Sequence, residues 1–221
     1  MTIPEILFED KHIIVVNKPS GIPVQTDKIG EKDLLSILRS HLKEQGEAPE
    51  VFPVHRLDQP VSGLVVLAKT HEAAAALSKG IQGDSFTKDY RAKVFMPSGF
   101  LENKASSFEL KDYLLKQKDN TSKVVPAGTR GAKEAVLTYE IAGTDPAAGT
   151  AELLVHLKTG RHHQIRVQLS HAGLPILGDR KYGTKESLEV SDSLGIGTIA
   201  LTAYRLKFIH PATGKAMEFT L

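Results

Sequence analysis

Residues 55–69 read HRLDQPVSGLVVLAK, a polar turn that leads directly into an apolar run. The Pro, Ser and Gly are typical of a turn, and an apolar run bounded by turn residues predicts a strand covered on both faces of its sheet. Asp58 therefore lies on a loop beside a buried strand, a position where functional residues are common. Taken alone, a turn aspartate more often caps a backbone N–H or pairs with a nearby arginine, here Arg56.

Composition bounds the class of protein. The 221 residues are 41% hydrophobic and 24% charged, enough to bury one sizeable core, so we expect one domain, although two halves also fit. The chain contains no cysteine, which excludes disulfides, thiolate metal sites and thiol nucleophiles. No run is long and apolar enough to span a membrane and the first residues do not resemble a signal peptide, so we expect a cytoplasmic protein.

The charge pattern allows a nucleic-acid partner only through a local patch. The net charge is +2, but residues 158–185 are rich in Lys, Arg and His, with Asp179 as their sole acid. A solvated helix face is the alternative explanation of this stretch. We expect no metal site, since His162 and His163 are adjacent and no Glu or Cys stands at ligand spacing.

Periodicity and capping residues predict an α+β fold with a mixed, largely antiparallel sheet and flanking helices and loops. The predicted elements are strands at 13–16, 64–69, 86–94, 135–141 and 151–157, helices at 33–46, 70–79 and 161–172, and a terminal hairpin of 199–209 with 216–221. Gly80 and Gly83 would end the second helix, and His162 and Arg166 would share a face of the third. Residues 97–133 are mostly polar and suggest short strands, long loops or a mobile arm.

Four segments together resemble the RluA-type family of RNA pseudouridine synthases. They are the stretch around Asp58, KDYRA at 88–92, GRHHQIR at 160–166 and GLPILGDRKYG at 173–183. The resemblance covers most of the chain and implies the pseudouridine synthase catalytic fold over residues 1–221. Because the chain begins directly with the opening of that domain, we expect no small S4 RNA-binding domain ahead of it.

The resemblance also implies residue roles. Asp58 would be the catalytic carboxylate, Tyr90 would pack on the target base, and Arg166 would pair with the aspartate. Arg56 would displace the target nucleotide from its stack. Further substrate contacts are expected from Lys88, Arg161, His163 and Gln164.

Three positions depart from the family pattern. Val61 stands where threonine is usual, and Gln168 and Thr202 stand where histidine is common. These departures spare the residues assigned to chemistry and bear instead on substrate contacts and local packing.

The implied reaction breaks the bond between C1′ and N1 of a uridine, turns the uracil and joins C5 to C1′. It has no redox change, so no cofactor is expected. A carboxylate can add to C1′ or C6 or take a proton from C2′, and the sequence does not choose among these routes. The target uridine lies in structured RNA (rRNA or tRNA) and must be turned out of its stack, at a cost of a few kcal/mol. Neither the RNA nor the uridine is identified by the sequence, and a monomer is the default oligomeric state.

Two alternatives remain. One is a catalytically inactive RNA-binding or folding protein that retains the synthase fold, motivated by the three departures. The other is a nucleoside glycosidase, against which the missing second catalytic carboxylate argues.

Overall fold

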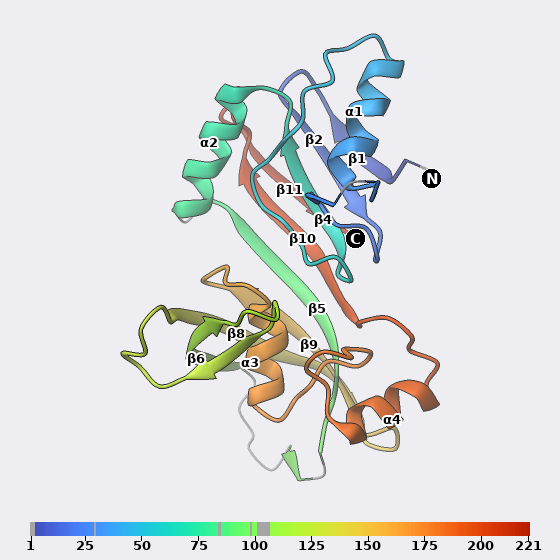
Figure 1. Ribbon diagram of the computed structural model, residues 1–221, viewed down its shortest axis with the longest axis vertical. Helices are drawn as coiled ribbons and strands as arrows, with labels where there is room; N and C mark the ends of the chain where they lie inside the picture. Colours follow the sequence, from blue (N-terminus) through green and yellow to red (C-terminus); the bar gives the residue numbers. More distant parts are fainter. Residues whose placement is uncertain (1–2, 29, 84, 98, 101–106) are drawn as a thin grey trace. The chain divides into compact units, whose positions relative to one another are not determined.

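The computed structural model describes residues 3–28, 30–83, 85–97, 99–100 and 107–221. Backbone contacts divide the chain into two compact units (Figure 1). The terminal unit comprises Met1–Lys88 and Thr202–Leu221, and the central unit comprises Asp89–Leu201. Both units combine antiparallel strands with helices, which confirms the predicted α+β class. That they form one catalytic domain stays a prediction.

The terminal unit is a mixed sheet with two helices. Its strands are β1 (Glu5–Glu9), β2 (Ile13–Lys18), β3 (Phe52–Pro53), β4 (Ser62–Ala68), β10 (Leu201–Ile209) and β11 (Ala216–Thr220). They follow the order β1-β2-β4-β10-β11, and β3 also pairs with β4. The β4–β10 pair is parallel and the others are antiparallel. The terminal hairpin of β10 and β11 confirms the prediction for this segment.

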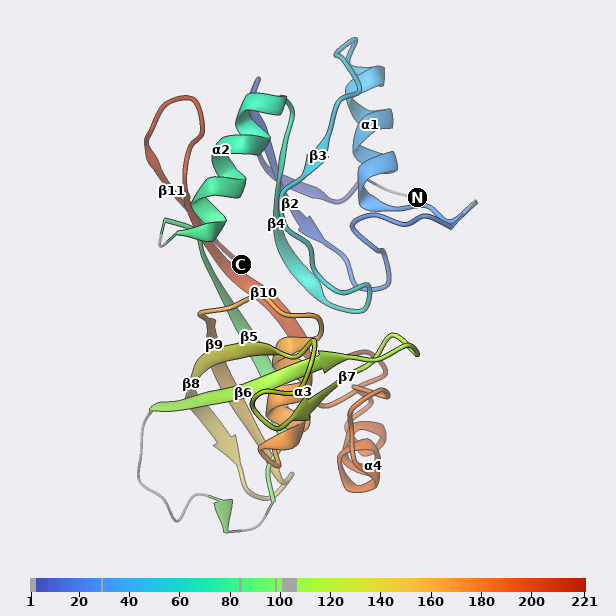
Figure 2. The same cartoon turned by 60° about the vertical axis from the view of Figure 1, so that its left-hand side comes forward.

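Strand β4 is buried on both faces, as its apolar run predicts. From Leu64 to Ala68 no side chain is more than 1% exposed. Helices α1 (Leu34–Glu44) and α2 (His71–Gln82) lie on either side of β2 and β4 (Figures 1 and 2). Ala73 and Leu77 of α2 pack against Val66 and its neighbours on one of these faces. The loop before β4, which carries Asp58, therefore leads directly into a buried strand.

Capping residues set the predicted starts of both helices. The Asp33 carboxylate accepts a bond of 2.7 Å from Ser36 N, and Ser36 Oγ accepts one of 3.1 Å from Asp33 N. Thr70 Oγ1 caps α2 by accepting from Ala73 N at 3.1 Å. Of the two glycines predicted to end α2, Gly83 is confirmed as the C-cap, whereas the end at Gly80 is wrong because the helix continues to Gln82. An interior glycine costs a helix only about 1 kcal/mol, and the packing of Ile81 against the core opposes that cost.

The central unit is antiparallel. Its elements are β5 (Thr87–Phe95), β6 (Ser107–Lys116), β7 (Ser122–Val125), β8 (Lys133–Asp145), β9 (Thr150–Leu157), α3 (Gln164–His171) and α4 (Lys185–Ser193). The strands follow the order β5-β9-β8-β6-β7, with β5 entering from the terminal unit. The β8–β9 hairpin confirms the predicted strand pair.

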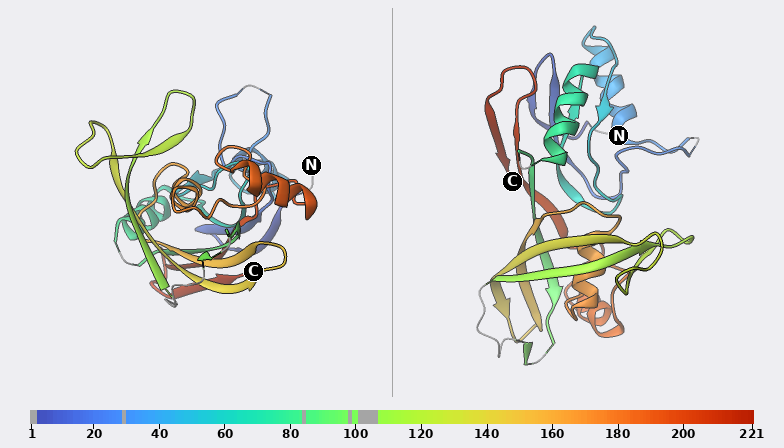
Figure 3. Two further views of the ribbon diagram at one scale, coloured as in Figure 1. Left: turned by 90° about the horizontal axis from the view of Figure 1, so that it is seen from below. Right: turned by 90° about the vertical axis from the view of Figure 1, so that its left-hand side faces the viewer.

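The polar segment at 97–133 contains a longer strand than we expected. Strand β6 runs for ten residues and pairs with both β7 and β8, while residues 98 and 101–106 lie outside the described part of the chain. The loops that flank β7 project beyond the other strands of this unit (Figure 3). None of the helices in the described ranges is long and apolar enough to cross a membrane.

Helix α3 begins later than its sequence suggests. His163 is its N-cap, with a left-handed φ of 54°, so the helix starts at Gln164. The prediction that His162 and Arg166 share a helical face is therefore wrong. His162 lies in the preceding turn, and its ring stacks on that of His163 at 3.7 Å between centroids.

Candidate active-site segments

Asp58 lies on a short loop that is bonded to the segment after β2. Val61 N donates to Asp58 O at 3.0 Å, which closes the turn that follows the aspartate. Gly21 N donates to Gln59 O at 2.9 Å, and Ser20 Oγ donates to Pro60 O at 2.6 Å. The backbone on the C-terminal side of Asp58 is thus held in one place.

The buried ammonium of Lys18 is the centre of this arrangement. Its side chain is 0% exposed, and Nζ donates to the carbonyl oxygens of Pro19, Ile22 and Gln59 at 3.0, 2.7 and 3.2 Å. Burial lowers the pKa of Lys18 to about 8, and the negative charge of Asp58 opposes this shift. Lys18 therefore remains cationic at neutral pH and ties the Asp58 loop to the end of β2.

The far end of the loop is fixed by the close approach of β4 and β10. Gly63 has a φ of +117°, and a Cβ at this position would lie 2.3 Å from Ala203 O. Beside it, Ser62 Oγ and Thr202 Oγ1 are 3.0 Å apart and share a hydrogen bond. Thr202, one of the departures from the family pattern, is accommodated by this bond, and Val61 is buried at 3% exposure.

His55 presents a buried donor next to an ammonium group. Its Nε2 accepts from Val66 N at 3.1 Å, so Nδ1 carries the proton of the neutral ring, and Nδ1 has no partner among the described residues. Burial, reinforced by the charge of Lys88, lowers the pKa of His55 to about 3. Lys88 Nζ lies 5.7 Å from the centroid of the Phe86 ring, and burial lowers its pKa as well. Lys88 forms no ion pair within the part of the chain that the structure describes.

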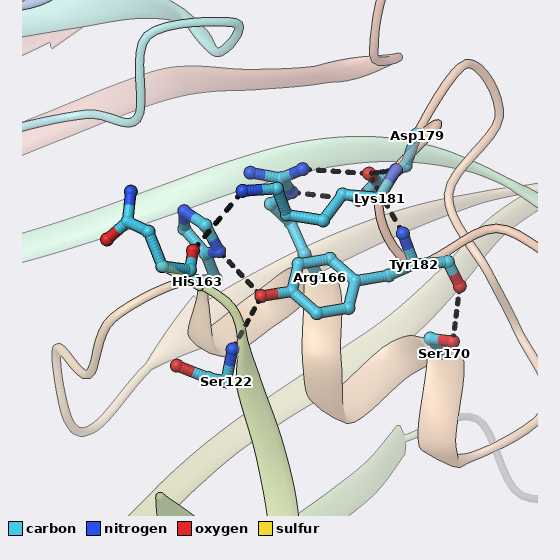
Figure 4. A network of polar contacts seen from close by, with 8 residues as sticks. Ser122, His163, Arg166, Ser170, Asp179, Lys181 and Tyr182 are labelled. Atoms are coloured by element: carbon cyan, nitrogen blue, oxygen red, sulfur yellow. Dashed lines mark hydrogen bonds and ion pairs between the residues drawn. The ribbon is translucent and has the colours of Figure 1, made fainter. Parts of the chain in front are cut away.

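In the central unit, Arg166 is buried against a carboxylate (Figure 4). Its Nε donates to Asp179 Oδ2 and its Nη2 to Asp179 Oδ1, each at 2.8 Å. The guanidinium carbon lies 5.0 Å from the centroid of the Tyr182 ring. Arg166 is thus not part of an exposed phosphate-binding patch, although its sequence neighbours are basic.

Tyr182 connects this pair to the start of α3 and to β7 (Figure 4). Its hydroxyl oxygen accepts from Ser122 N at 2.8 Å and lies 2.6 Å from His163 Nδ1, to which the hydroxyl proton can be donated. Ser122 Oγ is also 2.9 Å from His162 Nδ1. The ring of His163, which we expected to contact substrate, is bonded to the protein through Nδ1.

Gln164 and Arg161 shape the turn before α3. Gln164 Oε1 accepts from Arg161 N at 2.9 Å and from Thr159 Oγ1 at 2.8 Å, and its Nε2 donates to Val136 O at 3.1 Å. Gln164 is 3% exposed, whereas Arg161 is exposed and donates from Nε to Glu134 O at 2.8 Å. Of these two predicted substrate contacts, Arg161 is the one that solvent reaches.

Gln168, the remaining departure, is buried in the same helix. Its Nε2 donates to Asp112 Oδ2 at 2.8 Å and to Ala135 O at 3.2 Å. These bonds tie α3 to β6 and β8. Gln168 thus has a structural role within the central unit.

Tyr90 lies on β5, opposite Val155 of β9, and is 6% exposed. Asp58 belongs to the terminal unit, while Tyr90 and Arg166 belong to the central unit. The meeting of the three residues in one site stays a prediction. The described ranges hold no cluster of three or more His, Cys, Asp or Glu side chains that could bind a metal ion.

A set of exposed cations around β7 was missed in the sequence. These β7 cations are Lys116, Lys118, Lys123, Arg130 and Lys133. None of them forms an ion pair within the described ranges. In the stretch we favoured, by contrast, Lys158 lies 2.6 Å from Glu109 and Arg180 lies 3.5 Å from Asp192. The sequence does carry a signal for this set, because residues 116–133 contain these five basic residues and a single acidic residue, Asp119.

Comparisons with known proteins agree with the fold and the motifs. Residues 12–171 match the RNA pseudouridylate synthase family. The ribosomal large subunit pseudouridine synthase D of Vibrio parahaemolyticus is 34% identical, over 97% of this chain and 66% of its own length. The tRNA pseudouridine synthase C of Pectobacterium carotovorum is 32% identical, over 98% of this chain and 58% of its own length. The chain thus spans somewhat less than two thirds of each of these relatives.

Solved structures share the fold. Human RNA pseudouridylate synthase domain containing 1 aligns with a TM-score of 0.76 at 22% identity, over 99% of this chain and 82% of its own. Human RNA pseudouridylate synthase domain containing 4 gives the same TM-score at 24% identity. The family match, the curated relatives and the motifs around Asp58 and Arg166 agree, and the chain belongs to the RluA-type family of RNA pseudouridine synthases.

Proposed function

We propose that this protein isomerises specific uridines in structured rRNA or tRNA to pseudouridine, with Asp58 as the catalytic carboxylate. The observation that carries the proposal is the construction of the Asp58 loop. Lys18 binds the carbonyl of the residue after Asp58, and Gly63 permits the close approach that ends the loop. A fully buried lysine bound to three carbonyls is a costly way to hold a surface turn, and it is well suited to a reacting group that must stay in place.

The chemistry requires an ionised Asp58 and a retained base. The N1–C1′ bond breaks, C5 bonds to C1′, the proton on C5 leaves and N1 gains a proton, so the product is an isomer of the uridine. Asp58 adds to C1′ or C6 or takes the C2′ proton. Arg166 pairs with the Asp58 carboxylate, and the Tyr90 ring stacks on the uracil while it turns.

RNA binding would rest on cations that the protein leaves without acidic partners. Arg56 is exposed and lies two residues before Asp58. Lys88 lies on β5 and forms no ion pair in the described part of the chain. We assign Arg56 to filling the space left by the turned-out nucleotide, and Lys88 and Arg161 to the phosphates near it. The β7 cations would bind phosphates of the RNA backbone further from the target uridine. We propose that the protein acts as a monomer in the cytoplasm.

The test is pseudouridine formation by wild type and by Asp58→Asn on transcribed rRNA and tRNA, together with pseudouridine mapping in RNA from cells with and without the gene. We expect product with wild type and none with Asp58→Asn. Asp27→Asn, which removes an exposed carboxylate of the same unit, should remain active. An unmodified RNA with intact, salt-sensitive binding would indicate the inactive RNA-binding protein instead, and release of free uracil would indicate a glycosidase.

A further inference from the structure

Residues 178–183, GDRKYG, contact Arg166 through two side chains (Figure 4). We propose that Asp179 is a positioning residue, which holds the Arg166 guanidinium in the one orientation in which it can serve the reaction. This inference rests on the proposed function, in which Arg166 is the partner of Asp58.

The guanidinium geometry makes one carboxylate sufficient to fix the group. Arg166 meets Asp179 with the edge formed by Nε and Nη2, and the two bonds are equal at 2.8 Å. Because the guanidinium is planar, two bonds on one edge fix both its plane and its direction. The edge formed by Nη1 and Nη2 consequently faces away from Asp179. The side chains are 6% and 1% exposed, so water does not compete for these bonds.

Asp179 is itself held by the backbone of its own turn. Its Oδ1 accepts from Lys181 N at 3.0 Å and from Tyr182 N at 3.3 Å. Gly178 has a φ of +72°, and a Cβ there would lie 2.1 Å from Thr198 O, so the turn can pack closely only with glycine. Gly178 N donates to Ser191 Oγ of α4 at 2.9 Å. The Asp179 carboxylate is therefore held in place by backbone bonds that do not depend on Arg166.

Tyr182 holds the guanidinium from a second side. Its ring lies 5.0 Å from the Arg166 guanidinium carbon, and its hydroxyl is anchored to Ser122 N and His163 Nδ1. The Asp179 carboxylate and the Tyr182 ring, both held by other bonds, thus determine where the flexible Arg166 side chain lies. A displacement of about 1 Å in a positioning group can cost about 100-fold in rate, so the Asp179 contact is expected to affect turnover more than RNA affinity.

The first arm of the test measures Arg166 directly in the free, full-length protein. The Nε–Hε group of Arg166 should give a protected, rigid NMR resonance in wild type, and this resonance should become mobile in Asp179→Asn. Asp192→Asn is the matched control, because it removes an exposed carboxylate that also lies beside an arginine. A mobile Arg166 in wild type, or an unchanged one in Asp179→Asn, would overturn the proposal.

The second arm measures single-turnover pseudouridine formation. Asp179→Asn should lower the rate constant by about 100-fold with unchanged RNA affinity, while Asp192→Asn should leave both unchanged. Low-millimolar guanidinium chloride should restore activity to Arg166→Ala, whose cavity keeps Asp179 and the Tyr182 ring, but not to Arg166→Ala/Asp179→Ala. Equal rescue in both backgrounds contradicts positioning by Asp179, and this comparison stands even where Asp179→Asn fails to fold. If wild type forms no pseudouridine, the proposed function fails, whereas the NMR comparison still decides how Arg166 is held.

Discussion

Replacing Lys18 with methionine should free the Asp58 loop to move and so lower the reaction rate strongly, while it lowers the free energy of unfolding only moderately. Methionine keeps the length and apolar stem of lysine but loses the bonds to Pro19, Ile22 and Gln59. The Pro19 and Ile22 carbonyls would each cost about 2 kcal/mol when left without this donor, and the weaker Gln59 bond about 1 kcal/mol, since Gly21 N still binds that oxygen. The total loss is about 5 kcal/mol.

The burial of the lysine charge offsets part of this loss. Burial lowers the pKa of Lys18 from 10.5 to about 8, which corresponds to roughly 3.5 kcal/mol at about 1.4 kcal/mol per pKa unit. The net destabilisation by Lys18→Met is therefore about 1.5 kcal/mol at neutral pH. Between about pH 8 and 10.5 the unfolded chain holds a proton that the folded protein has lost, so the contribution of Lys18 to the free energy of unfolding rises with pH. The methionine variant lacks this rise.

Urea unfolding below and above this pH range measures the stability difference, and single-turnover pseudouridine formation measures the loop. We expect a rate lowered by about 100-fold in Lys18→Met. Lys11→Met removes an exposed lysine of the same unit and should match wild type in both assays. If Lys18→Met is as stable and as active as Lys11→Met, the buried ammonium does not hold the Asp58 loop.

Two further predictions concern charge. The His55 ring should stay neutral throughout the pH range near 6.5, since burial and Lys88 lower its pKa to about 3, and ring ¹⁵N shifts that titrate near 6.5 would contradict its burial. Changing Lys116, Lys118 and Lys123 to glutamine should reduce the slope of log affinity for RNA against log salt by roughly 2 to 3, because each phosphate contact contributes about 0.7 to 0.9. The matched control changes three exposed lysines of the terminal unit, Lys11, Lys43 and Lys79. An equal change of slope in both triple variants would show that the β7 cations have no special role.

The elements that the sequence predicted well are those whose cause is local. Asp33 and Thr70 cap helices through bonds to residues three positions away, and the apolar run of β4 needs only its own composition to be recognised. The motifs around Asp58 and Arg166 likewise identify the family because they are contiguous. Each of these signals fits within a few residues.

The features that were missed depend on contacts between distant residues. Helix α4 has few apolar residues, and the hydroxyls of its two buried serines bond to backbone. Ser187 Oγ donates to Thr184 O, and Ser191 Oγ donates to Ser187 O and accepts from Gly178 N. Hydrophobic periodicity cannot detect a helix whose buried face is made of serine. The left-handed His163 is an exception, because its cause is local: the bond from Arg161 N to Gln164 Oε1 replaces the first helical turn.

Helix α3 itself argues that the central unit is built around Arg166. From Gln164 to Leu169 every residue is at most 5% exposed, although three of these six side chains are polar or charged. Replacing a buried ion pair with apolar residues often costs no stability, so a pair such as Arg166 and Asp179 is weak support for the fold. It is strong support for orientation, because these three side chains bind the protein on several sides of α3: Gln164 binds the 159–161 turn and β8, Arg166 binds the Asp179 turn, and Gln168 binds β6 and β8. A rotation of α3 about its axis would break all of these bonds together, so the helix fixes where the Arg166 side chain begins, and Asp179 then fixes the orientation of its guanidinium.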